Sequence, residues 1–258
     1  MSFHLGALFI LVGLFAGMVL CVYIGQRLGQ RQHAKAAELA HMRLTAVEAA
    51  VFGLMGLYIA FTFSGAAQRY ELRRQLTVDE TNAIGTCYLR LDLLPVSQQA
   101  ALREKYRRYV EARLAVYHVL PDEKASAEHA AVATGLQKEI WTGTIAALKE
   151  APPHATLVVI PALNQMIDIT TTRAVAGLTH TPRLIMAMVC VLGFVCSLLA
   201  GYVIAGSHTR WGGLHLFAFS LMMTTTIYVI FDLDFPRFGM IRLDFADQGM
   251  IDLLAQMK

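Results

Sequence analysis

The charged side chains that could form a functional site lie in two segments of the sequence. Arg69, Arg73 and Arg74 follow one apolar run, and Asp232 and Asp234 follow another. Arginine and aspartate side chains at the ends of apolar runs can form partly desolvated ion pairs. The alternative is that each segment is an ordinary helix exit, with interfacial arginines in the first and a proline turn in the second.

A third candidate is one face of an apolar run. Leu57, Phe61, Ser64 and Gln68 recur at helical spacing, and Tyr58 lies beside this face. If several copies of the chain placed this face around a shared axis, the Phe61 side chains could form a hydrophobic constriction. Packing of the same aromatic side chains between helices of the core is the alternative.

Catalytic and metal-binding patterns are not found in the sequence. It contains no GxSxG, HExxH, P-loop or dinucleotide-binding motif. Asp79 and Glu80 are adjacent, so they point to different faces of a helix, which is poor geometry for an acid and base pair. No cysteine and histidine pair has the spacing of a zinc site. We therefore expect no enzyme activity, no cofactor and no bound metal.

The composition indicates an integral membrane protein. Hydrophobic residues make up 56% of the chain and charged residues only 16%, which exceeds what a soluble surface tolerates. Four apolar runs account for this excess, and each approaches the roughly 20 residues that a helix needs to cross a bilayer. These runs are residues 5–25, 45–66, 183–206 and 214–231.

The segment between the second and third runs is predicted to be helical throughout. Its residues show no strand alternation, and Ile84, Cys87, Tyr88 and Leu91 form an apolar stripe with helical spacing. We expect Ser126 to cap one helix, and Thr181 to cap the third span with Pro182 as its first residue. The fold class is all-α, a polytopic membrane protein with a helical extramembrane domain between helices two and three. Its parts are the first transmembrane pair (1–66), the extramembrane domain (67–181), the second pair (182–231) and an acidic C-terminal tail (232–258).

Basic residues in the short loops predict the orientation. Because excess lysine and arginine in short loops stays cytoplasmic, both short loops should lie inside and the extramembrane domain outside. The basic residues are Arg27, Arg31, Lys35, Arg43 and Arg210, against the single acid Glu38. The net charge of +3 is small and dispersed, which argues against a nucleic-acid partner.

The charged segments and the spacing of the runs resemble a bacterial membrane family, the bestrophin-like domain of unknown function. The resemblance extends over essentially the whole chain and includes a signature of the form acid-Leu-Asp-x-Pro-Phe-x-Gly after the last span. Asp232, Leu233, Asp234, Pro236 and Gly239 match this signature. Phe238 sits one position later than the expected aromatic residue, and Arg237 occupies the usual place of that residue.

The resemblance implies a homo-oligomeric ion channel in the bacterial inner membrane, with the second span lining the pore, while the basic short loops place the extramembrane domain in the periplasm. The lipid bilayer and ions are then the partners of the protein. The pore-lining candidates become Leu57, Tyr58, Phe61, Ser64 and Gln68. A membrane sensor or scaffold whose helical domain binds another protein remains the alternative.

Overall fold

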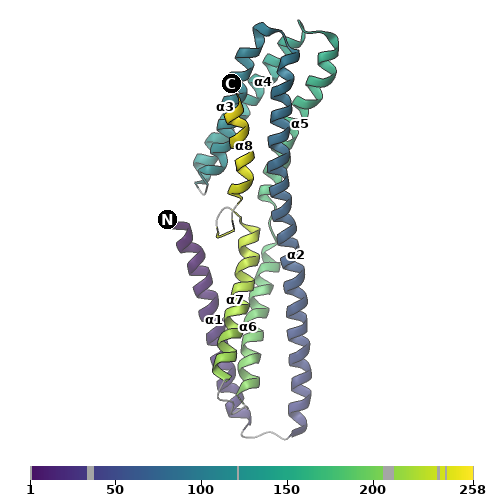
Figure 1. The fold of residues 1–258 in the computed structure, drawn as a ribbon. Helices are drawn as coiled ribbons and strands as arrows, with labels where there is room; N and C mark the ends of the chain where they lie inside the picture. The colour runs from purple at the N-terminus through teal and green to yellow at the C-terminus, as the bar shows by residue number, and fades with distance from the viewer. Residues whose placement is uncertain are drawn as a thin grey trace. The chain divides into compact units, whose positions relative to one another are not determined.

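The chain folds into α-helices joined by short connections. The computed structural model describes residues 2–33, 38–120, 122–205, 212–236, 239–241 and 243–257. No strand occurs among these residues, so the all-helical prediction is confirmed. In order, the elements are α1 (Ser2–His33), α2 (Glu38–Arg90), the 3-10 turn η1 (Leu91–Leu93), α3 (Val96–His118), α4 (Glu123–Leu148), α5 (Pro153–Leu178), α6 (Arg183–Ile204), α7 (Gly212–Asp234) and α8 (Asp244–Gln256) (Figure 1).

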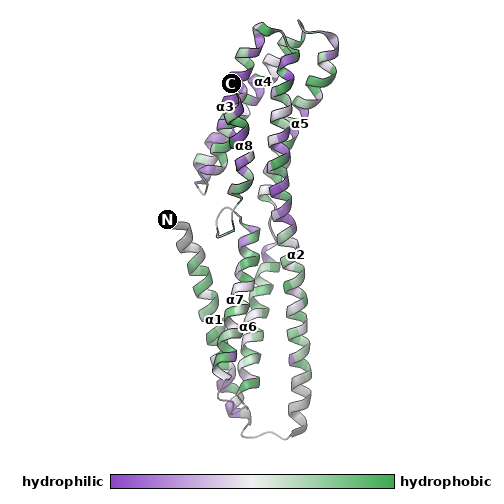
Figure 2. Cartoon of the chain, in the orientation of Figure 1, coloured by the Kyte–Doolittle hydropathy of each residue, from purple (hydrophilic) through white to green (hydrophobic). Residues whose placement is uncertain are grey.

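Four helical segments are long and apolar enough to cross a membrane. They are Leu8–Arg31, Ala46–Leu93, Pro153–Ile204 and Gly212–Asp234. Hydrophobic residues dominate α1, α6, α7 and the first half of α2, while charged and polar residues increase in the second half of α2 (Figure 2). The prediction of four membrane-spanning helices is therefore confirmed by length and composition.

Two compact units make up the chain. The membrane unit contains Met1–Arg69 and His180–Met240, and the insert unit contains Tyr70–Thr179 and Ile241–Lys258. Helix α2 contributes its first part to the membrane unit and its second part to the insert unit. The C-terminal helix α8 belongs to the insert unit, so the segment predicted as one acidic tail is shared between the two units.

Close packing of α1 against α6 holds the membrane unit together. A Cβ atom at Gly25 would overlap the carbonyl oxygen of Leu198, and one at Gly201 would overlap the carbonyl oxygen of Val22. Only glycine permits the two helix backbones to approach this closely, as in small-residue packing between membrane helices. The buried core of this unit consists of Met18, Met55, Val189, Cys196 and Ile227.

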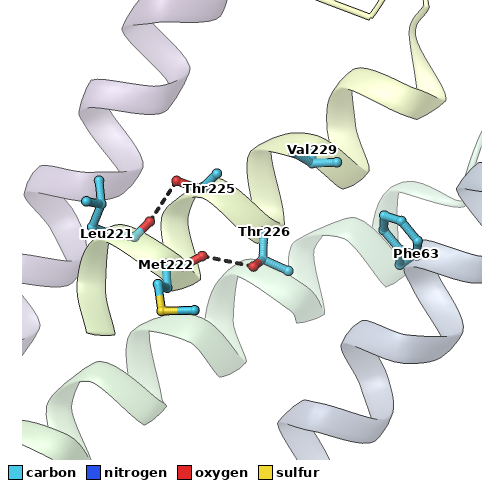
Figure 3. A pocket seen from close by; sticks show the side chains of 6 residues that line it. All are labelled: Phe63, Leu221, Met222, Thr225, Thr226 and Val229. Atoms are coloured by element: carbon cyan, nitrogen blue, oxygen red, sulfur yellow. Dashed lines mark hydrogen bonds between the residues drawn. The ribbon is translucent and has the colours of Figure 1, made fainter. Parts of the chain in front are cut away.

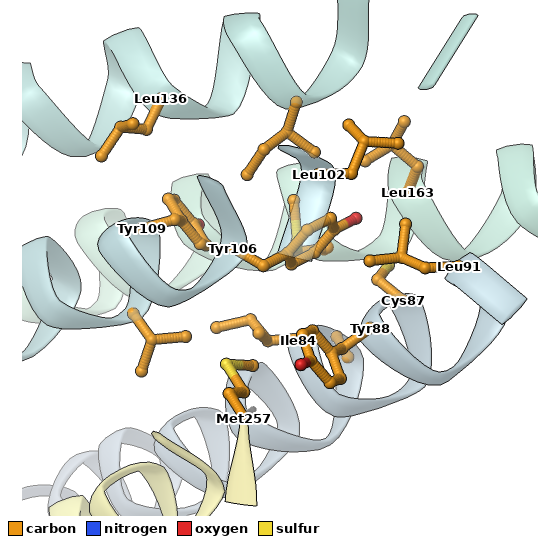
Figure 4. Close-up of a cluster of buried hydrophobic side chains, with 14 of the residues drawn as sticks. Ile84, Cys87, Tyr88, Leu91, Leu102, Tyr106, Tyr109, Leu136, Leu163 and Met257 are labelled. Atoms are coloured by element: carbon orange, nitrogen blue, oxygen red, sulfur yellow. The ribbon is translucent and has the colours of Figure 1, made fainter. Parts of the chain in front are cut away.

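The insert unit has a larger aromatic core (Figure 4). Tyr106 and Tyr109 of α3 are almost fully buried, and the Tyr106 ring meets Tyr88 of α2 edge to face at 6.2 Å. The predicted stripe of Ile84, Cys87, Tyr88 and Leu91 is buried in this core. Burial of each large apolar side chain contributes about 1.5–3 kcal/mol, which explains why these helices need one another.

The predicted helix caps at Ser126 and Thr181 are wrong. The cap is four residues earlier, at Asp122, whose carboxylate accepts the Ala125 N–H at 3.0 Å, so helix α4 begins at Glu123. The Ser126 hydroxyl instead donates to the Val116 carbonyl at 2.9 Å. At α6 the capping position is Pro182 rather than Thr181, and the helix begins at Arg183.

Candidate functional site

A fully buried carboxylate marks the end of α7 in the membrane unit. Asp234 has no exposed surface, and one of its oxygens accepts the Nε–H of Arg69 at 2.8 Å. Its other oxygen accepts the backbone N–H of Thr181 at 2.9 Å. The Arg69 guanidinium also donates to the Thr181 hydroxyl. The last turn of α7, the start of α6 and α2 are therefore joined at one charged group.

His180 completes the surroundings of Asp234. Its Nδ1 lies 3.0 Å from the Asp234 carbonyl oxygen and 3.9 Å from a carboxylate oxygen of the same residue. The imidazole stacks on the ring of Phe235, with centroids 4.3 Å apart and planes inclined by 16°. Main-chain and side-chain contacts thus fix the connection that leads into α6.

The second aspartate of the signature holds the turn that follows α7. Both carboxylate oxygens of Asp232 accept the N–H of Met240, at 2.9 and 3.0 Å. A Cβ atom at Gly239 would occupy the place of one of these oxygens, so the turn requires glycine there. Pro236 is buried beside this turn. Arg237 and Phe238, where the sequence departs from the signature, lie outside the described residues.

The other two arginines of the first segment have partners of a different kind. Arg73, which belongs to the insert unit, donates to the carbonyl oxygens of Ala176 at 3.1 Å and Thr179 at 2.7 Å. Arg74 binds Glu71 on its own helix at 2.6 Å, and both side chains are about half exposed. Arg69 is therefore the arginine that the structure places at the aspartate signature.

The pore-lining candidates lie on a face of α2 that its own chain leaves open. Leu57 is 54% exposed and Phe61 is 70% exposed. Ser64 and Gln68 are exposed too, and the Gln68 amide donates to the Ser64 hydroxyl at 3.2 Å. Tyr58 turns away and is half-buried, with its hydroxyl 3.6 Å from the Met188 sulfur. Packing of Phe61 in the core of its own chain is therefore excluded.

A groove borders another side of α2 in the membrane unit. It has a volume of about 410 Å³ and is lined by Phe63 of α2 and by five residues of α7 (Figure 3). The hydroxyls of Thr225 and Thr226 donate to the carbonyls of Leu221 and Met222 on their own helix, at 2.8 and 2.9 Å. The groove therefore presents an almost wholly apolar surface, suited to an acyl chain or another helix.

The insert unit contains a buried ionic network that the sequence did not reveal. The Glu80 carboxylate of α2 is fully buried and binds Arg113 of α3 at 2.6 Å and Arg173 of α5 at 2.5 Å. Arg173 also reaches Asp247 of α8 at 3.4 Å, and its guanidinium lies 3.9 Å from the centre of the Tyr117 ring. Four elements are thus tied together by two arginines and two acids.

Electrostatics favours the charged forms in this network. Burial opposes the charge of Arg113, but the neighbouring Glu80 carboxylate outweighs it and raises the pKa of Arg113. A sequence signal for the network existed. Arg113 follows the buried residues Tyr106 and Tyr109 by seven and four positions, and Arg173 follows Met166 by seven. A charged residue within an apolar stripe indicates a buried ion pair, because a buried charge needs a partner.

Metal binding is not supported by the described part of the chain. Among those residues, no three or more histidine, cysteine, aspartate and glutamate side chains are grouped so that they could hold a metal ion. The four cysteines form no disulfide. In the insert unit, burial raises the pKa of the Cys87 thiol to about 11. The arrangement is therefore one of structural ion pairs and an open helix face.

Comparison with known proteins gives a family and a fold. Residues 12–243 match the bestrophin-like domain family. A tryptophan-to-alanine variant of a bacterial bestrophin homologue from Klebsiella pneumoniae has 13% identity and a TM-score of 0.70, over 96% of this chain and 98% of that one. A leucine-to-threonine variant has 12% identity and a TM-score of 0.71, over 97% and 98%. No curated protein matches the chain.

Proposed function

Because the chain belongs to the bestrophin-like family, we propose that it is one subunit of a homo-oligomeric ion channel in the bacterial inner membrane, with α2 lining the pore. Four spans of a single chain enclose too little space for a water-filled path. Copies related by a rotation axis can place the same helix face around a shared opening. The bestrophin homologues with the same fold support this architecture at the level of fold.

One observation carries the proposal, namely the polar side chains on the open face of α2. Ser64 is exposed within the apolar run 45–66, and Gln68 is exposed two positions beyond it, in the longer helical segment Ala46–Leu93 that contains this run. A hydroxyl or amide group exposed to hydrocarbon would lose its hydrogen bonds to water, which costs roughly 4–8 kcal/mol where the solvent cannot replace them. Water in a shared pore removes that cost. Polar side chains inside membranes accordingly face a cavity or a partner helix.

Phe61 is the constriction in this proposal. It lies one turn from Leu57 and one turn from Ser64 on the same face, and its side chain is more exposed than that of Leu57. A ring of phenylalanine side chains, one from each subunit, would form a hydrophobic gate that closes by dewetting. The adjacent hydroxyl and amide groups would form the wetted part of the same wall.

The insert unit lies outside the bilayer in this proposal. Its buried network of Glu80, Arg113, Arg173 and Asp247 has matched charges, and its outer surface carries further pairs such as Lys105 with Glu139. Such a charged surface is unsuited to lipid. The basic residues of the short loops favour a cytoplasmic location for those loops and a periplasmic one for the insert unit.

Reconstitution in liposomes tests the proposal. The wild-type protein should release trapped ions, and Phe61→Ala should increase the flux by widening the hydrophobic gate. Phe63→Ala is the matched control, because Phe63 is an aromatic residue of the same helix that faces the α7 groove. Equal effects of both substitutions would remove Phe61 from the pore. Absence of flux for the wild type and every variant, with several ions and pH values, would refute the channel.

A second candidate function rests on a groove in the insert unit. This groove of about 400 Å³ is lined by Thr134, Gln137, Lys138, Trp141, Asn164 and Ile167 of α4 and α5. A tryptophan beside amide groups is typical of protein-binding surfaces, which favours a sensor or scaffold. Liposomes without flux, together with a purified partner whose binding is lost in Trp141→Ala, would support this function over the channel.

A further inference from the structure

Two exposed arginines lie on one face of α1, close to its C-terminal end. Arg27 and Arg31 are four positions apart, so they are neighbours on the helix surface. The opposite side of α1 packs against α6, where Cβ atoms at Gly25 and Gly29 would overlap backbone carbonyl oxygens of α6. Because each residue turns the helix by about 100°, the two arginines point away from α6.

The arginines lie where α1 leaves the apolar part of the membrane. The candidate span Leu8–Arg31 has 24 residues, which extend over about 36 Å at 1.5 Å per residue. The hydrocarbon core of a bilayer is about 30 Å thick, so the charged end of this span belongs in the headgroup region. Hydrophilic residues appear in the last turns of α1 (Figure 2). Arginine side chains near helix ends reach the headgroups from this level.

The exposed ring of Tyr23 orients one of the two guanidinium groups. The central carbon of the Arg27 guanidinium lies 5.1 Å from the centre of this ring, which is within the range of a cation–π contact. Tyrosine side chains are typical of the headgroup level of membranes. The C-terminal end of a helix dipole also favours positive charge. The cation is therefore held at the membrane surface by its own helix.

The membrane unit offers no exposed carboxylate to these arginines. Helix α1 contains no aspartate or glutamate, and no salt bridge to Arg27 or Arg31 is found in the described part of the chain. Among the acids of this unit whose side chains the structure describes, Glu48, Asp232 and Asp234 are all buried. The membrane unit of a second copy would have the same buried acids. The anion that fits this face therefore belongs to a different kind of molecule.

Apolar side chains share the face with the arginines. Leu20, Ile24 and Leu28 are all exposed, and helical spacing places them beside Arg27 and Arg31 on the side turned away from α6. A molecule that covers the whole face needs a negative group next to a hydrocarbon chain. A phospholipid has both, whereas free phosphate has only the negative group.

We propose that Arg27, Arg31 and the ring of Tyr23 bind the headgroup of an anionic phospholipid, whose acyl chain lies along Leu20 and Ile24. The planar guanidinium group matches phosphate oxygens with two parallel hydrogen bonds. Basic residues next to a membrane span recognise anionic lipids in this way. A zwitterionic lipid is disfavoured, because this face has no acid for its ammonium group. The binding does not depend on whether ions pass along α2.

Native mass spectrometry of the purified full chain tests this site. The protein is titrated with phosphatidylglycerol and with phosphatidylcholine that has the same acyl chains, and the wild type should bind phosphatidylglycerol more tightly. The affinity for phosphatidylglycerol should fall about fivefold for each arginine replaced by glutamine, which corresponds to roughly 1 kcal/mol per basic residue near an anionic surface. The affinity for phosphatidylcholine should stay unchanged.

Two further variants separate the charge of this face from other effects. Replacing both Arg27 and Arg31 by lysine keeps the charge and should keep the preference for phosphatidylglycerol. Arg108→Gln is the matched control, because it removes an exposed arginine from α3, which lies in the insert unit and outside the candidate spans. This variant should bind both lipids as the wild type does.

The results that would overturn the site differ from one another. An unchanged affinity for phosphatidylglycerol in the double glutamine variant would refute it, and equal losses for both lipids would refute the preference for an anionic headgroup. Competition by glycerol phosphate as strong as that by the lipid would assign the site to free phosphates. The same spectra report the number of subunits, so a double variant that dissociates with its lipid binding intact would make this face an interface between copies. If the double variant does not fold, the single variants decide, each with an expected loss of about fivefold.

Discussion

Replacing Arg69 by glutamine should destabilise the membrane unit more than replacing Asp234 by asparagine. The reason is the unequal exposure of the partners, since the side chain of Asp234 is fully buried and that of Arg69 is 24% exposed. Arg69→Gln leaves a buried carboxylate without its cation, whereas Asp234→Asn leaves a guanidinium that can reach water. An asparagine can still accept the N–H of Thr181, which Asp234 binds at 2.9 Å.

The expected magnitudes follow from these exposures. Breaking a buried ion pair by removing one partner costs about 3–5 kcal/mol, so Arg69→Gln should lower the melting temperature in detergent by on the order of 10 °C. Asp234→Asn should cost about half as much, because the remaining charge is partly solvated. The double variant should be more stable than the sum of the single losses predicts, with a coupling energy of roughly 1–3 kcal/mol.

Arg74→Gln provides the control for this cycle. Arg74 pairs with Glu71 on the exposed surface of the same helix, and an exposed pair contributes little to stability. The melting temperature of Arg74→Gln should therefore equal that of the wild type within the error of the measurement. Strict additivity of Arg69→Gln and Asp234→Asn would refute the reasoning, because it would mean that the two side chains do not stabilise each other.

Three further predictions concern the core, the helix packing and the topology. Glu80→Gln should cost about 3–5 kcal/mol in denaturant unfolding, because two buried arginines lose their shared carboxylate; an unchanged unfolding free energy would contradict the network. Gly201→Ala should lower the melting temperature by overpacking α1 against α6, at a cost of about 1–3 kcal/mol, whereas Gly13→Ala, which meets open space, should not. In intact cells a membrane-impermeant maleimide should label Glu150→Cys and spare Arg31→Cys, and the reverse pattern would invert the topology.

The sequence predicted the elements better than their partners. Apolar runs and helical stripes depend on local spacing, so the four spans and the buried stripe around Cys87 could be recognised from the sequence, as could the family. Arg69 and Arg73 lie four positions apart on one face of α2, so the sequence could not decide which of them meets Asp234. That choice depends on a shift of a single helical turn, which only the packing of the membrane unit determines.

The network around Glu80 was missed for a related reason. Its four charged residues come from α2, α3, α5 and α8, separated by up to 167 positions in the sequence, from Glu80 to Asp247. A charge within an apolar stripe indicates a buried ion pair, but it does not show which helices meet. The role of Thr181 was hidden in the same way, because its hydrogen bonds to Arg69 and Asp234 join residues that are far apart. The pore-lining role of α2 stays a prediction.

Chemical modification of a cysteine at position 64 tests the pore most directly. In a variant whose four native cysteines are replaced, Ser64→Cys should react with a charged, membrane-impermeant thiol reagent, and the reaction should block ion flux in liposomes. Thr225→Cys is the control, because Thr225 is an exposed hydroxyl residue on α7 outside the proposed pore, and its flux should persist. Flux that persists after complete modification at position 64, or a cysteine there that the reagent never reaches while ions flow, would contradict the assignment of this face of α2 to the pore.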